Sequence, residues 1–188
     1  PAVSAGWIVS NENFMKGALP WLDLLKLRGS YGLVGNDQFG TNPSDFRFFY
    51  LSFYANSNDG YNFGTQNNSN PGGIRQQRLA NTEVTWEKAR KTNVGIDIEL
   101  LRRRLTLSVD VFQEHRYDVI TNLGDADKQG FPSLVGAAAP LLNVGIVDNH
   151  GIDLEVTWSD KIGQYITYSL RPNFSFARNK IVYEREIP

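Results

Sequence analysis

Two pairs of acidic residues are the first feature of this sequence that could do chemistry. Asp97 and Glu99 stand two positions apart, and so do Asp153 and Glu155. Side chains two apart on a β-strand point to the same face, so each pair would present two carboxylates together. Paired carboxylates hydrolyse glycosides when they are held at a suitable separation. The alternative is a strand face bathed in water, which we favour because the neighbouring segments have similar polar content.

Other common sites find little support in the composition. His115 and His150 are the two histidines, and they lack the matched spacing of a zinc site. There is no cysteine, which excludes a disulfide framework and a thiolate metal site. The 19 Lys and Arg residues are balanced by 20 Asp and Glu residues, so there is no basic excess for nucleic acid. We therefore expect no catalytic residues, no cofactor, no metal site and no nucleic-acid partner.

Six segments that alternate with period two would position the acids. In "RLTLSVDVFQEHR", residues 104–116, the leucines and valines share one face of a strand, and Thr106, Ser108 and Asp110 share the other. The remaining segments are residues 2–10, 25–33, 92–100, 151–159 and 165–179. Globular strands average about 5–6 residues, whereas a strand tilted across a bilayer needs about 9–11. The lengths favour strands that cross a membrane.

The connections between these segments alternate in length. Residues 36–90 and 117–149 form two long polar connections, whereas residues 101–104 and 160–164 form short turns. Antiparallel strands would place both long connections at one end of the sheet. Transmembrane β-barrels have this layout, with short periplasmic turns and long extracellular loops. The fold class predicted is an all-β, antiparallel transmembrane barrel segment of about six strands.

In such a barrel the two strand faces meet different solvents. Apolar side chains would face lipid, with Trp7, Trp158 and Tyr168 as aromatic residues of the membrane interface. Polar side chains would line a water-filled lumen, and the candidates are Arg28, Asp97, Glu99, Asp110, Asp153, Glu155 and Arg171.

The first long connection contains an aromatic-rich stretch, "DFRFFYLSFY", at residues 45–54. Aromatic side chains on a loop can stack on sugar rings, pack on a partner or pack among themselves. The candidates for contact with a ligand or partner are Phe46, Phe48, Tyr50, Tyr54 and Tyr61.

The same segments resemble the SusC/RagA family of TonB-dependent outer-membrane transporters. The resemblance rests on "VSAGWIVSNENFMK" (residues 3–16), "LKLRGSYGLVGND" (residues 25–37) and three further stretches in the order and spacing of the later part of that family's barrel. Those stretches are residues 81–120, 143–158 and 173–182.

The resemblance implies a segment of a 22-stranded barrel in the bacterial outer membrane. It implies import of oligosaccharides, glycans or peptides together with a SusD-like surface lipoprotein. It further implies that residues 1–188 are a partial barrel with no plug domain, so that TonB would act only through a plug outside this chain.

Six strands of a barrel leave two open edges, which are unfavourable in lipid and prone to pairing in water. We therefore expect outer-membrane lipid as a partner, and further barrel strands from another chain or from more of the same protein. The alternative is a soluble, secreted β-sandwich that binds carbohydrate and buries its apolar faces in a core.

Overall fold

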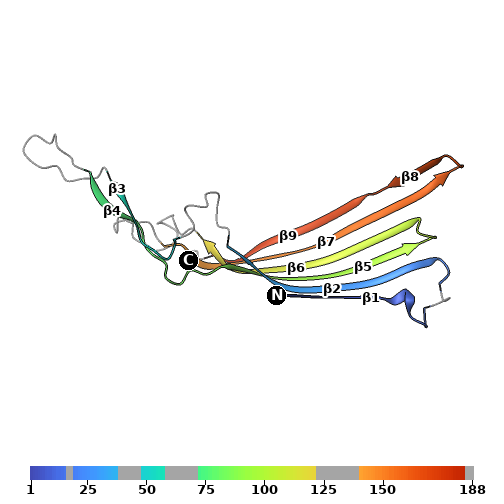
Figure 1. Ribbon diagram of the computed structural model, residues 1–188, viewed down its shortest axis with the longest axis horizontal. Coiled ribbons are helices and arrows are strands. Elements are labelled where there is room, and N and C mark those ends of the chain that lie inside the picture. The colour runs from blue at the N-terminus through green and yellow to red at the C-terminus, as the bar shows by residue number, and fades with distance from the viewer. Residues whose placement is uncertain (16–18, 38–47, 58–71, 122–139, 185–188) are drawn as a thin grey trace, which may run out of the picture. The chain divides into compact units, whose positions relative to one another are not determined.

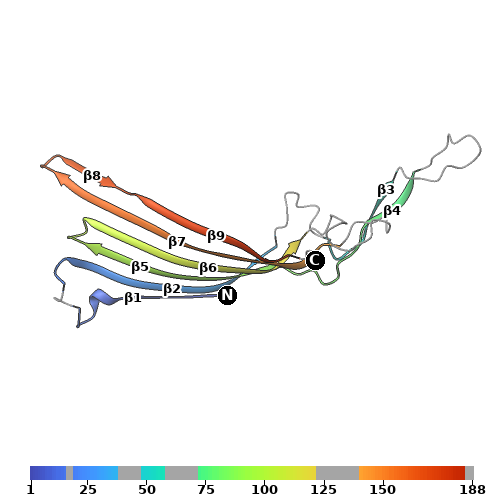
Figure 2. The same ribbon diagram turned by 180° about the vertical axis from the view of Figure 1, so that it is seen from behind.

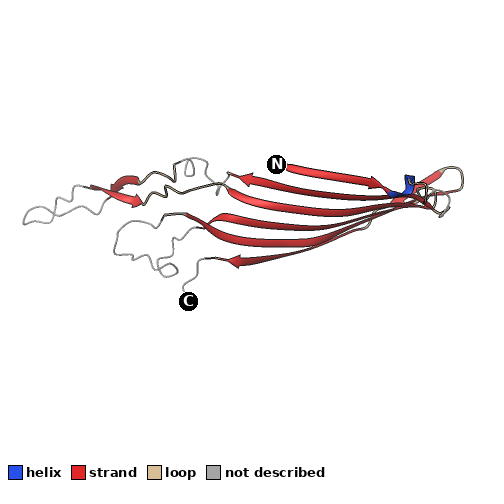
Figure 3. Cartoon of the chain, turned by 90° about the horizontal axis from the view of Figure 1, so that it is seen from below, coloured by secondary structure: helices blue, strands red, loops and turns tan. Residues whose placement is uncertain are grey.

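The computed structural model describes residues 1–15, 19–37, 48–57, 72–121 and 140–184, and these residues are mostly β-strand (Figure 3). The strands are β1 (Ala2–Ile8), β2 (Leu22–Asn36), β3 (Phe53–Ser57), β4 (Gly73–Arg78), β5 (Glu87–Leu100), β6 (Leu105–Thr121), β7 (Leu142–Ile162), β8 (Ile166–Leu170) and β9 (Asn173–Tyr183). One 3-10 turn, η1 (Val9–Asn11), follows β1. Within the described ranges no helix is long and apolar enough to cross a membrane.

The main sheet follows the order of the chain. Its strands run β1-β2-β5-β6-β7-β8, and β9 also pairs with β7 (Figures 1 and 2). The β1–β2 pair is antiparallel, with Ala2 opposite Gly32 and Ile8 opposite Lys26. Strands β3 and β4 form a separate antiparallel hairpin.

Five of the six predicted strands correspond to β1, β2, β5, β6 and β7. The prediction of one continuous strand over residues 165–179 is wrong, because the chain leaves strand geometry at Arg171 and Pro172 between β8 and β9. Proline has no backbone N–H to donate to the ladder, which interrupts a strand. The Pro172 carbonyl still accepts a hydrogen bond from the Val156 N–H at 3.0 Å, so both pieces remain on β7.

The predicted long connections were too long at their ends. Strand β5 already begins at Glu87, β6 continues to Thr121, and β7 begins at Leu142. The first connection also contains the β3–β4 hairpin. This hairpin was not predicted, because β4, "GIRQQR", is polar and lacks the alternation that marks the other strands.

The chain divides into two compact units. The first comprises Pro1–Val34, Lys88–Arg116 and Val147–Ile181, and the second comprises Gly35–Glu87, Tyr117–Ile146 and Val182–Pro188. The first unit holds most of the main sheet, and the second holds the β3–β4 hairpin together with the ends of strands that lead to the long connections.

Within its described residues, the first unit has no hydrophobic core of the kind that stabilises a soluble domain. Among the described residues, Val9 and Phe49 are the buried hydrophobic side chains, and no large side chain is fully buried. The apolar side chains of the sheet stay open to solvent: Val94 is 57 % exposed, Val111 54 % and Phe176 54 %. Since the described strands of this unit form a single layer, they do not make the two-layer core that a β-sandwich requires.

Candidate functional site

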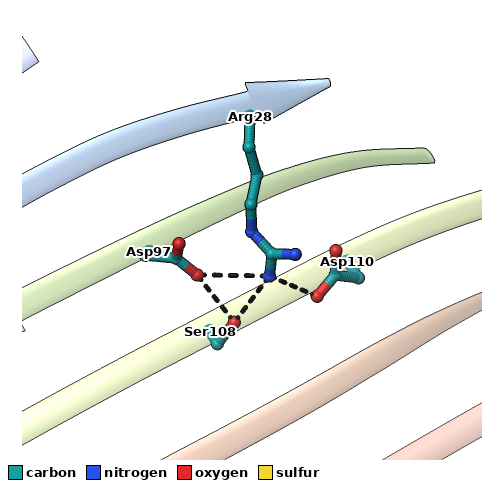
Figure 4. Close-up of polar contacts among 4 residues, drawn as sticks. All are labelled: Arg28, Asp97, Ser108 and Asp110. Atoms are coloured by element: carbon teal, nitrogen blue, oxygen red, sulfur yellow. Dashed lines mark hydrogen bonds and ion pairs between the residues drawn. The ribbon is translucent and has the colours of Figure 1, made fainter. Parts of the chain in front are cut away.

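A guanidinium group links three strands on the polar face of the sheet, the face that carries Arg28 (Figure 4). Arg28 of β2 donates from Nη2 to Asp110 Oδ2 of β6 at 2.6 Å and lies 3.2 Å from Asp97 Oδ1 of β5. The same Nη2 is 3.0 Å from Ser108 Oγ, and the Ser108 hydroxyl donates to Asp97 Oδ1 at 2.9 Å. We call Arg28, Asp97, Ser108 and Asp110 the Arg28 cluster. It satisfies the charge of Arg28 locally, on a face that is only partly shielded from water.

Gly95 leaves room for the Arg28 side chain to reach its partners in this cluster. Strand β5 lies between β2 and β6, so the Arg28 side chain must pass over β5 to reach Asp110. A Cβ atom built on Gly95 would lie 2.8 Å from Arg28 Nε and 2.7 Å from Asp110 Oδ1, closer than Cβ atoms approach in real structures. The absent side chain at this position therefore leaves the path of the guanidinium open.

A second polar feature lies beside the cluster. Asp110, Asp153 and Glu155 line an open pocket of about 280 Å³, together with Ser108, Leu154, Asn173, Phe174 and Ser175. The Ser175 hydroxyl donates a hydrogen bond to Asp153 across β9 and β7. Carboxylates, hydroxyls and an amide give this pocket hydrogen-bonding groups for polar solutes, while its open form leaves the acids in contact with water.

The structure separates the remaining predicted lumen residues from the Arg28 cluster. Glu99 pairs with Arg103 at 3.2 Å beside the short turn between β5 and β6. Arg171 is exposed at the break between β8 and β9, so its expected place on a continuous strand is wrong. Asp97 and Glu99 thus meet different surroundings, whereas Asp153 and Glu155 line the same pocket.

Sequence reasoning missed several members of the polar face. Gly95 and Ser108 were not predicted as site residues, although the cluster depends on both. Glu114 of β6 was also missed, and it lies 3.6 Å from Lys91 Nζ and 2.5 Å from Arg116 Nε. Glu114 and Arg116 continue the alternation of Ser108 and Asp110, so extending that pattern would have found them.

In the second unit, Asn81 joins three segments of the chain. Its side chain is buried, and Nδ2 donates to the Leu141 carbonyl at 2.7 Å while Oδ1 accepts from the Glu83 N–H at 2.9 Å. Its backbone N–H donates to the Phe49 carbonyl at 2.9 Å. Asn81 therefore ties the chain before β5 to residues of both long connections.

Asn143 makes a second link of the same kind. Its Nδ2 donates to the carbonyls of Thr85 at 2.7 Å and Asp118 at 2.8 Å, and its Oδ1 accepts from the Thr85 N–H at 3.0 Å. An asparagine side chain can both donate and accept, which suits it to pairing with a single residue's backbone. These bonds fix the chain where β6 ends and β7 begins.

The loop aromatics divide into packed and exposed side chains. Phe49 is 4 % exposed, and the Arg78 guanidinium lies 4.8 Å from its ring centroid. Phe48 and Tyr50 are exposed and meet edge to face, with centroids 6.2 Å apart. Tyr54, in β3, is also exposed. Two further predicted contact residues, Phe46 and Tyr61, lie outside the described residues.

Comparison with known proteins decides the family. Residues 1–186 match the model of the family described as "TonB dependent receptor-like, beta-barrel". The chain belongs to this family. The predicted fold class, an antiparallel segment of an outer-membrane β-barrel, is confirmed, and the described strands form an open sheet.

Relatives of this TonB-dependent receptor segment include the TonB-dependent receptor P39 of Formosa agariphila, with 31 % identity over 182 residues. The match covers 97 % of this chain and 16 % of the relative. The TonB-dependent receptor SusC of Bacteroides thetaiotaomicron is 26 % identical over 183 residues, covering 96 % of this chain and 17 % of SusC. The predicted resemblance to the SusC/RagA family is therefore confirmed. The chain spans less than a fifth of the length of either relative.

Solved structures share the fold. The RagAB peptide importer in its open-open state matches with a TM-score of 0.75 and 21 % identity, over 97 % of this chain and 18 % of that one. A structure of the RagAB peptide transporter matches with a TM-score of 0.74 and 22 % identity, over 96 % and 18 %. As proteins of this family are outer-membrane β-barrels, the predicted location in the bacterial outer membrane is confirmed.

Proposed function

We propose that this chain forms part of the wall of a TonB-dependent nutrient importer of the SusC type and carries no enzymatic activity. The observation that supports the proposal is the single-layered sheet with one exposed apolar face and one polar face cross-linked by the Arg28 cluster. In a membrane barrel both faces are satisfied, because lipid covers the apolar one and lumen water hydrates the other.

The proposed work of the polar face is to provide a rigid, hydrated wall. Arg28, Asp97, Asp110, Asp153 and Glu155 face the lumen in this proposal, with Glu99 beside a periplasmic turn. A guanidinium that contacts two carboxylates offsets part of their negative charge, so a passing solute meets hydrogen-bonding groups that carry a small net negative charge. We propose that residues 1–188 are a partial barrel only. The TonB-driven step belongs to a plug outside these residues.

Oligosaccharides, glycans or peptides are the proposed cargo, with a SusD-like lipoprotein as partner. The names of two similar proteins, SusC and the RagAB peptide importer, support this class of transporter. The exposed Phe48, Tyr50 and Tyr54 provide aromatic surface on the side of the long connections, where they would contact cargo or the lipoprotein. Further barrel strands would pair with the open edges of the sheet.

Single cysteines test the assignment of the two faces, since residues 1–188 contain no native cysteine. Val111→Cys and Glu155→Cys would be placed in the full-length protein, in a cysteine-free background, and labelled in intact outer membranes. We expect a membrane-impermeant, charged maleimide to label the cysteine at position 155 once the lumen is accessible, and a lipid-soluble maleimide to label the one at 111. Strong labelling at 111 by the charged reagent would contradict the proposal, because Val111 would then face water.

A further inference from the structure

On strands β5, β6, β7 and β9, the apolar face of the sheet ends at a common margin. Hydrogen bonds and ion pairs on both faces give the registers, because facing residues in an antiparallel pair have numbers that add to a constant. Two contacts agree for each pair of strands: Asp97–Ser108 and Lys91–Glu114 for β5 and β6, Arg104–Ser159 and His115–Asp148 for β6 and β7, and Asp153–Ser175 and Val156–Pro172 for β7 and β9.

These registers align the residues of the apolar face into rows across four strands. One row consists of Val94, Val111, Ile152 and Phe176. The next row toward the long connections consists of Thr92, Gln113, His150 and Arg178, and the row after it of Arg90, His115, Asp148 and Lys180. Each strand therefore changes from apolar to polar at the same register, on the side that leads to the extracellular loops.

The polar rows hold three cations, Arg90, Arg178 and Lys180, together with two histidines. We call Arg90, His115, His150, Arg178 and Lys180 the cationic belt; the one acid among them, Asp148, is bonded to His115. His150, Arg178 and Lys180 are exposed and have no ion-pair or hydrogen-bond partner within the described part of the chain. At the other end of the apolar face, near the short turns, Arg104 instead pairs with Asp160 at 3.5 Å.

We propose that the cationic belt binds the phosphate groups of an anionic membrane lipid at the extracellular margin of the barrel. The inference rests on the proposed function, because only a lipid-facing apolar surface brings the belt to the level of the headgroups. Arginine and lysine are the side chains that bind phosphate in proteins, arginine through a planar fork and lysine as a point charge. Cations near an anionic lipid surface each strengthen binding, and the attraction falls within a Debye length.

The test uses the full-length protein in neutral detergent micelles that contain either phosphatidylglycerol or phosphatidylcholine at equal mole fraction. Native mass spectrometry would count the lipids retained by the wild type and by the double variant Arg178→Gln/Lys180→Gln. The matched control is Lys26→Gln/Arg102→Gln, which removes two positive charges from the polar face and a short turn. Wild type and control should retain phosphatidylglycerol over phosphatidylcholine. The belt variant should bind phosphatidylglycerol more weakly, by roughly fivefold for each cation removed.

Two outcomes would overturn the inference. Equal retention of phosphatidylglycerol by the belt variant and the control would show that the belt does not bind this headgroup. Unchanged lipid retention with loss of a co-purifying protein would assign the belt to an acidic protein surface instead. The cysteine at position 111 separates these results from failure of the proposed function: its protection from the charged maleimide keeps the wall assignment while the belt inference fails alone.

Discussion

Placing a charge on the apolar face of β6 gives the sharpest test of which side of the sheet meets lipid. Val109 shares this face with Leu107 and Val111, and it lies four residues before Gln113, where the polar rows begin. With a rise of about 3.4 Å per residue and a strand tilt of about 40°, Val109 sits roughly 10 Å below that margin. Half of an apolar band about 25 Å tall is roughly 12 Å, so Val109 lies close to the midplane.

At this depth Val109→Arg should destabilise the barrel by about 2–4 kcal/mol, whereas Gln113→Arg, at the margin, should change stability by about 0–1 kcal/mol. Thr106→Arg is the matched control on the other face of the same strand, and it should also have a small effect because lumen water hydrates the new charge. The measurement is the shift of the urea unfolding midpoint of the full-length protein in lipid vesicles, with the amount assembled in membranes as a second readout.

Two patterns of results would refute this reasoning. A larger effect of Thr106→Arg than of Val109→Arg would mean that the polar face packs against something dry. Complete loss of folding for Val109→Arg, in a protein found in the soluble fraction and not with membranes, would favour a soluble sandwich. In its buried core an unpaired charge has neither water nor a counter-ion to stabilise it.

Four further substitutions follow from local contacts. Gly95→Ala would push apart the Arg28 cluster and should lower stability by about 1–2 kcal/mol, seen as a lower unfolding midpoint. An unchanged midpoint would contradict this role for Gly95. Gly151→Ala places a methyl group against the backbone of β9 and should reduce stability by more than about 2 kcal/mol, whereas Gly73→Ala, with nothing within 4 Å, should be neutral within about 0.5 kcal/mol. Asn81→Asp keeps the acceptor but loses the donor to the Leu141 carbonyl, so hydrogen exchange near residue 141 should accelerate without a change in the unfolding midpoint of the barrel; unchanged exchange would count against the link.

The strands of the main sheet were predictable because apolar and polar residues alternate in a strand whose two faces meet different solvents. Leu105 to Val111 show this alternation without interruption, and the structure exposes Val111 as the pattern requires. The pattern could not locate the β3–β4 hairpin, whose residues are not sorted by face. The pattern also continued through Pro172, because the polarity of a side chain does not show that the backbone N–H is missing.

Of the site, only the face of the sheet on which it lies could be predicted from the sequence. Alternation assigned Arg28, Asp97 and Asp110 to one face of the sheet. Their contact, however, depends on strand register and on the absence of a side chain at Gly95 in β5. Gly95 carries no polar group, so it left no chemical signal in the sequence. Likewise, Phe49 looked like its aromatic neighbours, and only the fold distinguishes the buried ring from the exposed ones.

The order of strands has a consequence for assembly. Because the main sheet adds its strands in the order of the chain, it can grow from one hairpin to the next without threading one segment past another. The short turns close small loops and should form early, whereas joining β2 to β5 and β6 to β7 must first close a long loop at a larger entropic penalty. Growth of this sheet should therefore pause at those two joints, and the asparagine links would then hold each joint once it has closed.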